Sequence, residues 1–374
     1  MTNNTTWKLG HLIVCIGICV GFVLTAPLAA AAESMPESYN IDGVPLYQQI
    51  DARGCGAASL QMVFDYYGPF IDQMEIYNAA RSGGTPLPDM ARAAQFSWMS
   101  TTAGSRFENS VVTGYSGRAI GYAGFYYAAT EPWLDQLKFI VSQGYPVIVL
   151  VWWAPGYAGG DHYRVIVGYD DVEGVLIIND PWSREFKTDS EYYGSTSQSA
   201  NGNGQDTSFV GVKWKYEDFL WTWQCPTTRW GVPDLAYGAV FVAPWQVVIS
   251  APEKVTAGER FKVVATITYP CIAPFGSDQF PMFTAQAFDA KLNPGDGFSI
   301  KKGPVLSSIS TLGAGQSVEL SWTLVAKNTE GTYSFDITTT GMVSESLGPW
   351  HDYPSYDYED MIGGMASFEV IISL

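Results

Sequence analysis

The stretch QIDARGCGAASL, residues 49–60, indicates most about the fold of this chain. Cys55 stands directly before residues 56–67, in which small and apolar residues recur at helical spacing until Gly68-Pro69 ends the pattern. A helix N-terminus favours a thiolate and lowers the pKa of a cysteine placed there. The stretch therefore predicts a nucleophilic cysteine at the start of a helix. The alternative is an inert buried cysteine or one half of a disulfide.

Two later stretches supply the partners that a thiol nucleophile needs. They are GDHYRVI, residues 160–166, and INDP, residues 178–181. His162 is expected to open an apolar strand, where it can act as the base, and Asp180 follows another strand, where a carboxylate can orient the imidazole. The neighbouring Asn179 offers an amide that can do the same. The ordinary alternatives are a surface histidine and an Asp-Pro turn.

A glutamine precedes the cysteine by six residues. The side-chain amide of Gln49 can donate to an oxyanion beside the backbone N–H of Cys55. Composition alone does not choose between Gln49 and the adjacent Gln48, and a solvated loop glutamine is the other interpretation.

The pattern of apolar residues changes near residue 245. Upstream we expect α+β structure, with a sheet packed against the first helix. Downstream, short alternating strands separated by turn signals predict an all-β sandwich of immunoglobulin-like type. The expected helices are 56–67, 74–81, 88–96, 132–142 and 216–223; the expected strands are 146–152, 163–169, 175–178, 247–249, 261–269, 317–326 and 333–338. Residues 194–207, rich in Gly, Ser, Asn and Gln, are expected to form a loop.

The N-terminus has the features of an export signal. Lys8 precedes the apolar run 12–26, and the small residues 29–32 suit a signal peptidase. We therefore expect a signal peptide at 1–32, an α+β domain that carries Cys55, His162 and Asp180 at 33–245, and a β-sandwich domain at 246–374, in a secreted or cell-surface protein. An uncleaved anchor is the alternative.

The cysteine count fits an exported protein with one free thiol. Cys15 and Cys19 would leave with the signal, so the mature chain keeps Cys55, Cys225 and Cys271. Three is odd, so one thiol should stay free or pair between chains in an oxidising compartment. Cys225 and Cys271 are candidates for a disulfide.

The composition argues against nucleic acid as a partner. The formal net charge is −17, and the chain has no basic cluster to neutralise phosphates. The mature chain has two histidines, His162 and His351, of which the second lies in the expected β-sandwich.

Together these stretches resemble the active-site motifs of the papain-like family-39 cysteine peptidases, the bacteriocin-processing peptidases and their stand-alone relatives. The resemblance covers about residues 40–245. It assigns Gln49 to the oxyanion hole and Cys55 to the nucleophile, and it matches His162-Tyr163-Arg164-Val165 and Asp180-Pro181 to the family's histidine and Asp-Pro motifs. Transporter-linked members usually carry an aspartate where this chain has Gly54, and no ATP-binding cassette or membrane domain follows. A specificity for double-glycine leaders is therefore not carried over.

We expect an exported cysteine peptidase or amidohydrolase with the catalytic set Gln49, Cys55, His162 and Asp180, acting on peptides or proteins. It should need no metal or organic cofactor. An acyl transferase using the same acyl-enzyme is not separable from a hydrolase by sequence. The alternative from another class is a non-catalytic cell-surface binding protein that keeps the fold, motivated by the β-sandwich and by the aromatic segments 115–127 and 214–230. The sandwich is expected to contact the cell envelope, position the substrate or merely stabilise the protein.

Overall fold

A computed structural model describes residues 35–80, 84–100, 114–182, 210–226, 235–270, 284–303, 306–349 and 355–374. Residues Met35–Leu374 form one compact unit. The expected signal peptide, the expected loop 194–207 and His351 lie outside the described residues. Among the helices that are described, none is long and apolar enough to cross a membrane.

The first part of the chain is built on one antiparallel sheet of seven strands. Its order is β2-β7-β3-β4-β5-β6, and β1 pairs with β4. The strands are β1 (Ser38–Asn40), β2 (Ala123–Ala129), β3 (Val147–Ala154), β4 (Tyr157–Asp170), β5 (Val175–Asn179), β6 (Val212–Lys215) and β7 (Ala236–Ala243). Residues 147–151 of β3 are all buried, because helices cover both faces of the sheet at that point.

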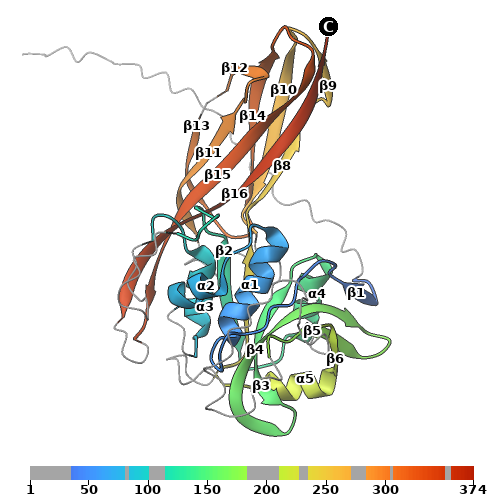
Figure 1. Ribbon diagram of the computed structural model, residues 1–374, viewed down its shortest axis with the longest axis vertical. Coiled ribbons are helices and arrows are strands. Elements are labelled where there is room, and N and C mark those ends of the chain that lie inside the picture. The colour runs from blue at the N-terminus through green and yellow to red at the C-terminus, as the bar shows by residue number, and fades with distance from the viewer. Residues whose placement is uncertain are drawn as a thin grey trace, which may run out of the picture. The chain divides into compact units, whose positions relative to one another are not determined.

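Five helices pack on the two faces of this sheet (Figure 1). They are α1 (Cys55–Tyr67), α2 (Gln73–Ala79), α3 (Leu87–Gln95), α4 (Leu134–Ser142) and α5 (Tyr216–Thr222). The first three share a core with Ile148 and Leu150 of β3, whereas α4 and α5 share the other core with Val147 and Val149. Alternate residues of β3 therefore point to opposite faces, as a pleated strand requires.

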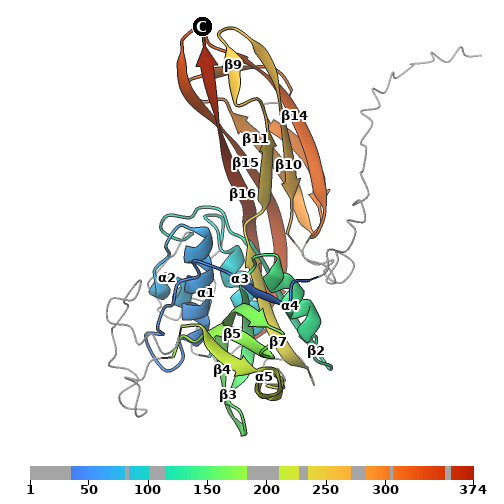
Figure 2. The same ribbon diagram turned by 90° about the vertical axis from the view of Figure 1, so that its right-hand side faces the viewer.

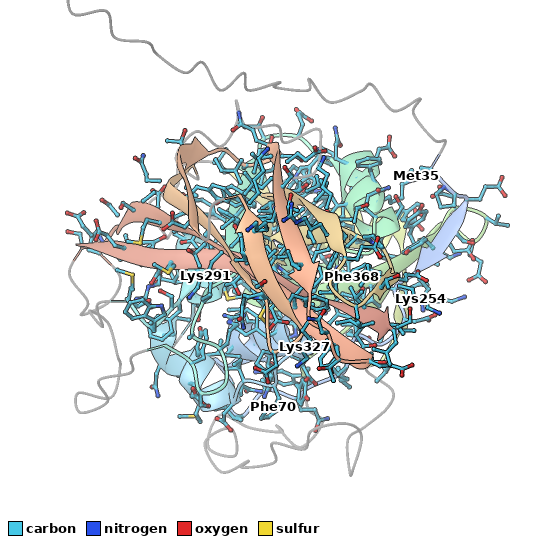
Figure 3. All side chains as sticks on the ribbon, turned by 90° about the horizontal axis from the view of Figure 1, so that it is seen from above. Met35, Phe70, Lys254, Lys291, Lys327 and Phe368 are labelled. Atoms are coloured by element: carbon cyan, nitrogen blue, oxygen red, sulfur yellow. The ribbon has the colours of Figure 1, made fainter. Side chains whose placement is uncertain are left out.

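The second part of the chain is a β-sandwich (Figure 2). One sheet has the order β12-β14-β10-β8 and the other β13-β11-β15-β16-β9. Its strands are β8 (Gln246–Ser250), β9 (Lys254–Thr256), β10 (Arg260–Thr268), β11 (Ala285–Asn293), β12 (Phe298–Lys302), β13 (Leu306–Leu312), β14 (Ser317–Ala326), β15 (Gly331–Leu347) and β16 (Tyr356–Ser373). Alternate residues of β10 are buried, and Val263 shares one core with Phe335 and Ile337 of the facing sheet. Phe368, labelled in Figure 3, is half-buried and packs against this core.

The long β15–β16 hairpin is bonded to the first part of the chain. The N–H of Gly121 donates to Met361 O at 2.8 Å, and the N–H of Gly363 donates to Gly121 O at 3.0 Å. Tyr358 also donates its hydroxyl to Gln95 Oε1 at 2.8 Å. The apolar core continues across the same junction, where the rings of Phe125 and Tyr269 lie 5.8 Å apart.

The expected α+β class and the β-rich second part are confirmed. The exact domain limits at 33–245 and 246–374 stay a prediction. One expectation about the site is wrong: His162 does not open a strand, because β4 begins at Tyr157 and pairs with β3 as a long hairpin that places His162 opposite Val151. The described aromatics Tyr115, Tyr122 and Phe125 are buried, so they are core residues rather than a surface for ligands.

Candidate active site

The loop before Cys55 is folded around Asp51. Its Oδ1 accepts from the backbone N–H of Arg53 at 2.8 Å, and its Oδ2 accepts from the hydroxyl of Tyr77 at 3.0 Å. The N–H of Gly54 donates to Asp51 O at 3.2 Å. This tight turn delivers Cys55 as the first residue of α1, with Gly54 as the N-cap.

Gln49 lies in the same loop and is almost fully buried, with 1% of its surface exposed. Its backbone N–H donates to Pro181 O at 2.7 Å, which ties this loop to the segment that carries Asp180. Its Nε2 donates to Asp51 O at 2.6 Å. Its Oε1 is buried and makes no hydrogen bond with the described residues. The bond to Asp51 O fixes the side chain of Gln49 and uses one of its two amide hydrogens, so the second remains available as a donor.

Cys55 is a half-buried free thiol. The next residue, Gly56, packs so closely on β4 that a Cβ there would lie 3.3 Å from the ring of Tyr163. Burial raises the pKa of the Cys55 thiol to about 12, Asp161 and Asp180 add to the rise, and the backbone N–H groups of Tyr163 and Gly56 oppose it. The sulfur therefore lies against the backbone of Tyr163, the residue that follows His162.

His162 projects from β4 and is buried. Its Nε2 lies 2.7 Å from Asp180 Oδ1. The ring of Trp153 packs 4.8 Å from the imidazole, centre to centre, and that of Trp182 packs at 6.1 Å. Burial lowers the pKa of His162 and Arg164 lowers it further, while Asp180 acts in the opposite direction. The imidazole is accordingly uncharged at neutral pH.

Asp180 follows β5 and has both carboxylate oxygens occupied. Oδ1 also accepts from the N–H of Trp182 at 3.0 Å, and Oδ2 accepts from Nε of Arg164 at 2.7 Å. Burial by itself would raise the pKa of Asp180, but Arg164 and His162 together hold it well below its usual range. An ionised carboxylate only accepts, so His162 Nε2 carries the hydrogen and Nδ1 is left as the basic nitrogen.

Of the two alternative residues, Asn179 has its side chain engaged elsewhere. The amide of Asn179 donates to Val44 O at 3.2 Å and accepts from the N–H of Gly211 at 3.0 Å, so it fastens neighbouring loops. The backbone carbonyl of Gln48 accepts from Nε2 of Gln73 at 3.0 Å. The structure therefore pairs His162 with Asp180, and it places the Gln49 loop against Pro181.

The site forms where β4 extends past the last residue of β5 that pairs with it. The register between these strands stops at Val165 and Asn179, so the earlier residues of β4 face the chain as it leaves β5 at Asp180. Arg164 was missed by the sequence analysis as a member of this site. The signal was present, because residues two apart on a strand share a face, and Arg164 follows His162 by two.

The described residues contain no group of His, Cys, Asp and Glu that could hold a metal ion. Cys225 is buried in the core, and Cys271 lies outside the described residues, so their pairing stays a prediction. The site gathers a thiol, an imidazole, a carboxylate and an amide donor in one region, and such a set suits nucleophilic catalysis.

Residues 41–202 match the model of the Peptidase_C39 like family, and this match supports a C39-like cysteine peptidase domain in this part of the chain. No curated protein matches the chain. Among solved structures, the chain is similar to a cohesin module from a family 33 glycoside hydrolase of Clostridium perfringens. That similarity has 13% identity and a TM-score of 0.20, and it covers 35% of this chain and 97% of the module.

Proposed function

Because residues 41–202 match the model of the Peptidase_C39 like family, we propose that the protein cleaves peptide or amide bonds with Cys55 as nucleophile, His162 as base and Asp180 as the orienting carboxylate. The observation that carries this proposal is the 2.7 Å pairing of His162 Nε2 with Asp180 Oδ1. A free thiol at the N-terminus of α1, which lies against the backbone of Tyr163, supports it. That pairing leaves Nδ1 of His162 as the proton acceptor.

The reaction begins with a neutral thiol and a neutral imidazole. His162 Nδ1 takes the proton from Cys55 as the sulfur attacks the carbonyl carbon of the substrate. The tetrahedral oxyanion accepts hydrogen bonds from the backbone N–H of Cys55 and from the remaining amide hydrogen of Gln49. Collapse of this intermediate breaks the C–N bond, and His162 gives its proton to the leaving amine.

A water molecule then completes the cycle. His162 Nδ1 removes a proton from the water as its oxygen attacks the thioester carbonyl. The second tetrahedral intermediate releases the carboxylic acid and returns the proton to the Cys55 sulfur. Asp180 holds the imidazole in one tautomer through both halves and stabilises the imidazolium that forms transiently. The buried side chains of Gln49, His162 and Asp180 support this assignment, since fixed groups need little reorganisation during the reaction.

We further propose that the protein is exported and acts on peptides or proteins outside the cytoplasm. The apolar run 12–26 and the small residues 29–32 support export. The β-sandwich is proposed to contact the cell envelope. Nucleic acid is not proposed as a partner, because the net charge is −17.

The test is turnover of a peptide library by the purified mature chain, residues 33–374, in water enriched in ¹⁸O. Mass spectrometry of the products should show new termini, with one heavy oxygen in each new carboxylate. Products that join the acyl group to an added amine would instead indicate a transferase. Cys55→Ala should form no products, whereas Cys225→Ala, which removes the other described thiol, should retain the cleavage pattern. Equal cleavage by wild type and Cys55→Ala would overturn the proposal.

A further inference from the structure

Arg164 is a buried arginine beside the proposed catalytic pair. It lies on β4 two residues after His162, with its side chain 3% exposed. An isolated buried charge is costly, so a buried guanidinium needs an anion and acceptors for its hydrogens. The contacts of Arg164 show which groups meet this need.

The hydrogen bonds of the guanidinium lead to Asp180 and to the β3–β4 hairpin. Its Nε donates to Asp180 Oδ2 at 2.7 Å, and its terminal nitrogens donate to Trp153 O at 2.8 Å and to Trp152 O at 3.4 Å. The ring of Trp214 packs 4.5 Å from the guanidinium carbon. The planar fork thus joins Asp180 to the β3–β4 hairpin, whose Trp153 ring packs on His162.

We propose that Arg164 is a positioning residue for this site: it fixes Asp180 in the orientation that His162 needs, and it offsets the carboxylate's charge so that His162 rests as an uncharged base. This inference rests on the proposed peptidase function and deepens it. A carboxylate with free rotation could meet His162 through either oxygen, whereas here Oδ2 is taken by Arg164 and Oδ1 is left for the imidazole.

The charges around His162 explain the second half of the proposal. Asp180 after β5 and Asp161 on β4 favour the imidazolium, Arg164 on β4 opposes it, and the Cys55 thiol of α1 lies nearby without charge. Removing Arg164 would leave the two carboxylates uncompensated. The pKa of His162 should then rise, and more of the imidazole would be protonated and inactive at neutral pH.

The test uses the mature chain with Arg164→Gln and Arg164→Lys. The titration of His162 is followed by NMR of its ring hydrogens, assigned by comparison with His162→Gln, and kcat/KM is measured across the same pH range. Arg164→Gln should raise the pKa of His162 by about one unit or more and move the acidic limb of kcat/KM by the same amount. Arg164→Lys keeps the positive charge, so the titration of His162 should stay near that of the wild type. Its kcat should fall, because an ammonium lacks the planar guanidinium that bonds Asp180 and both backbone carbonyls at once.

Arg92→Gln is the matched control. Arg92 is also buried and also faces a carboxylate, with its Nε 3.7 Å from Asp360 Oδ2, but it lies on α3. Its loss should lower stability without moving the titration of His162. If Arg164→Gln does not fold, Arg164→Lys decides, and an unchanged kcat in that variant overturns the positioning role.

The NMR readout does not need turnover, so the two proposals can fail separately. An unchanged His162 titration in folded Arg164→Gln overturns this inference even if the wild type cleaves peptides. A wild type without turnover overturns the proposed function, while the titration still decides what Arg164 does to His162.

Discussion

His162 and Asp180 are joined by a 2.7 Å hydrogen bond between Nε2 and Oδ1, although 18 residues of sequence and the whole of β5 separate them. The bond exists because β4 continues beyond the end of β5, where the chain turns at Pro181. It leaves Nδ1 of His162 as the basic nitrogen, and the predictions below follow from this assignment.

The pair of neighbours Asp180 and Asn179 gives the first prediction. Asp180→Asn should lower kcat by about 10²-fold or more, because an amide can present its N–H to His162 and stabilise the wrong tautomer. Asn179→Ala should chiefly lower the melting temperature, since that amide fastens Val44 and Gly211. Steady-state kinetics and thermal melts of both variants check this. A larger kcat loss in Asn179→Ala would contradict the assignment.

Gln49 and Gln48 form a second matched pair, because both are buried. Gln49→Ala should lower kcat by about 10²- to 10³-fold through loss of an oxyanion donor, with a small change in KM. Gln48→Ala keeps the backbone carbonyl that accepts from Gln73 and should retain most of the activity. The kinetics of the two variants decide between them, and similar kcat values would remove Gln49 from the oxyanion hole.

The pH dependence of activity should follow the base alone. The pKa of His162 is lowered by burial, so protonation removes the base only below its ordinary value of about 6.5. The pKa of Cys55 is raised to about 12, so no resting thiolate-imidazolium pair is present to be lost at alkaline pH. We expect kcat/KM to have an acidic limb below about pH 6.5 and a plateau above it. A bell with an alkaline limb set by loss of an imidazolium would instead indicate a resting ion pair.

Asp360, on β16, predicts how stability changes with pH. Burial raises its pKa from 3.8 to about 7, although Arg92 opposes the rise. Between about pH 4 and pH 7, the folded protein therefore keeps the proton on Asp360 that the unfolded chain has lost. The stabilisation from this protonated carboxyl is present at low pH and disappears as the pH rises through about 7.

Thermal melts between pH 4.5 and pH 8 test the contribution of Asp360. Asp360→Asn should flatten the decline of the melting temperature across the interval of about pH 4 to 7. Glu345→Gln is the control on the partner strand: burial also raises the pKa of Glu345 to about 7, but that side chain is only half-buried, so the flattening should be smaller. If the melting temperature of Asp360→Asn declined with pH as steeply as that of the wild type, the carboxyl of Asp360 would not be the cause of the decline.

Much of the site was predictable because it depends on local sequence. Small residues after Cys55 and the Gly68-Pro69 stop predicted the helix at 56–67, and α1 spans Cys55–Tyr67. The roles of the thiol, imidazole and carboxylate were inferred from their chemistry, and they stay a prediction. The choice of Asp180 over Asn179 was not derivable from the residues alone, since it depends on which of two adjacent side chains leaves β5 toward His162.

Other parts depend on long-range packing and were missed. Strand β16 contains Gly363 and Gly364, which weaken any strand pattern in sequence. The structure explains them, because a Cβ at these positions would lie 2.0 Å from Thr339 O and 2.1 Å from Trp245 O. The aromatic run around Phe125 similarly forms strand β2, and its burial comes from partners distant in sequence, such as Phe241 and Tyr269.

The most direct measurement of the central claim is the rate at which a peptide-based thiol electrophile modifies Cys55, read by intact mass and peptide mapping at pH 7.5. The account predicts stoichiometric modification at Cys55 in the wild type, none in Cys55→Ala, and a rate lowered by about 10²-fold or more in His162→Ala, which lacks the base. Equal rates in the wild type and His162→Ala, or modification at a different residue, would contradict it.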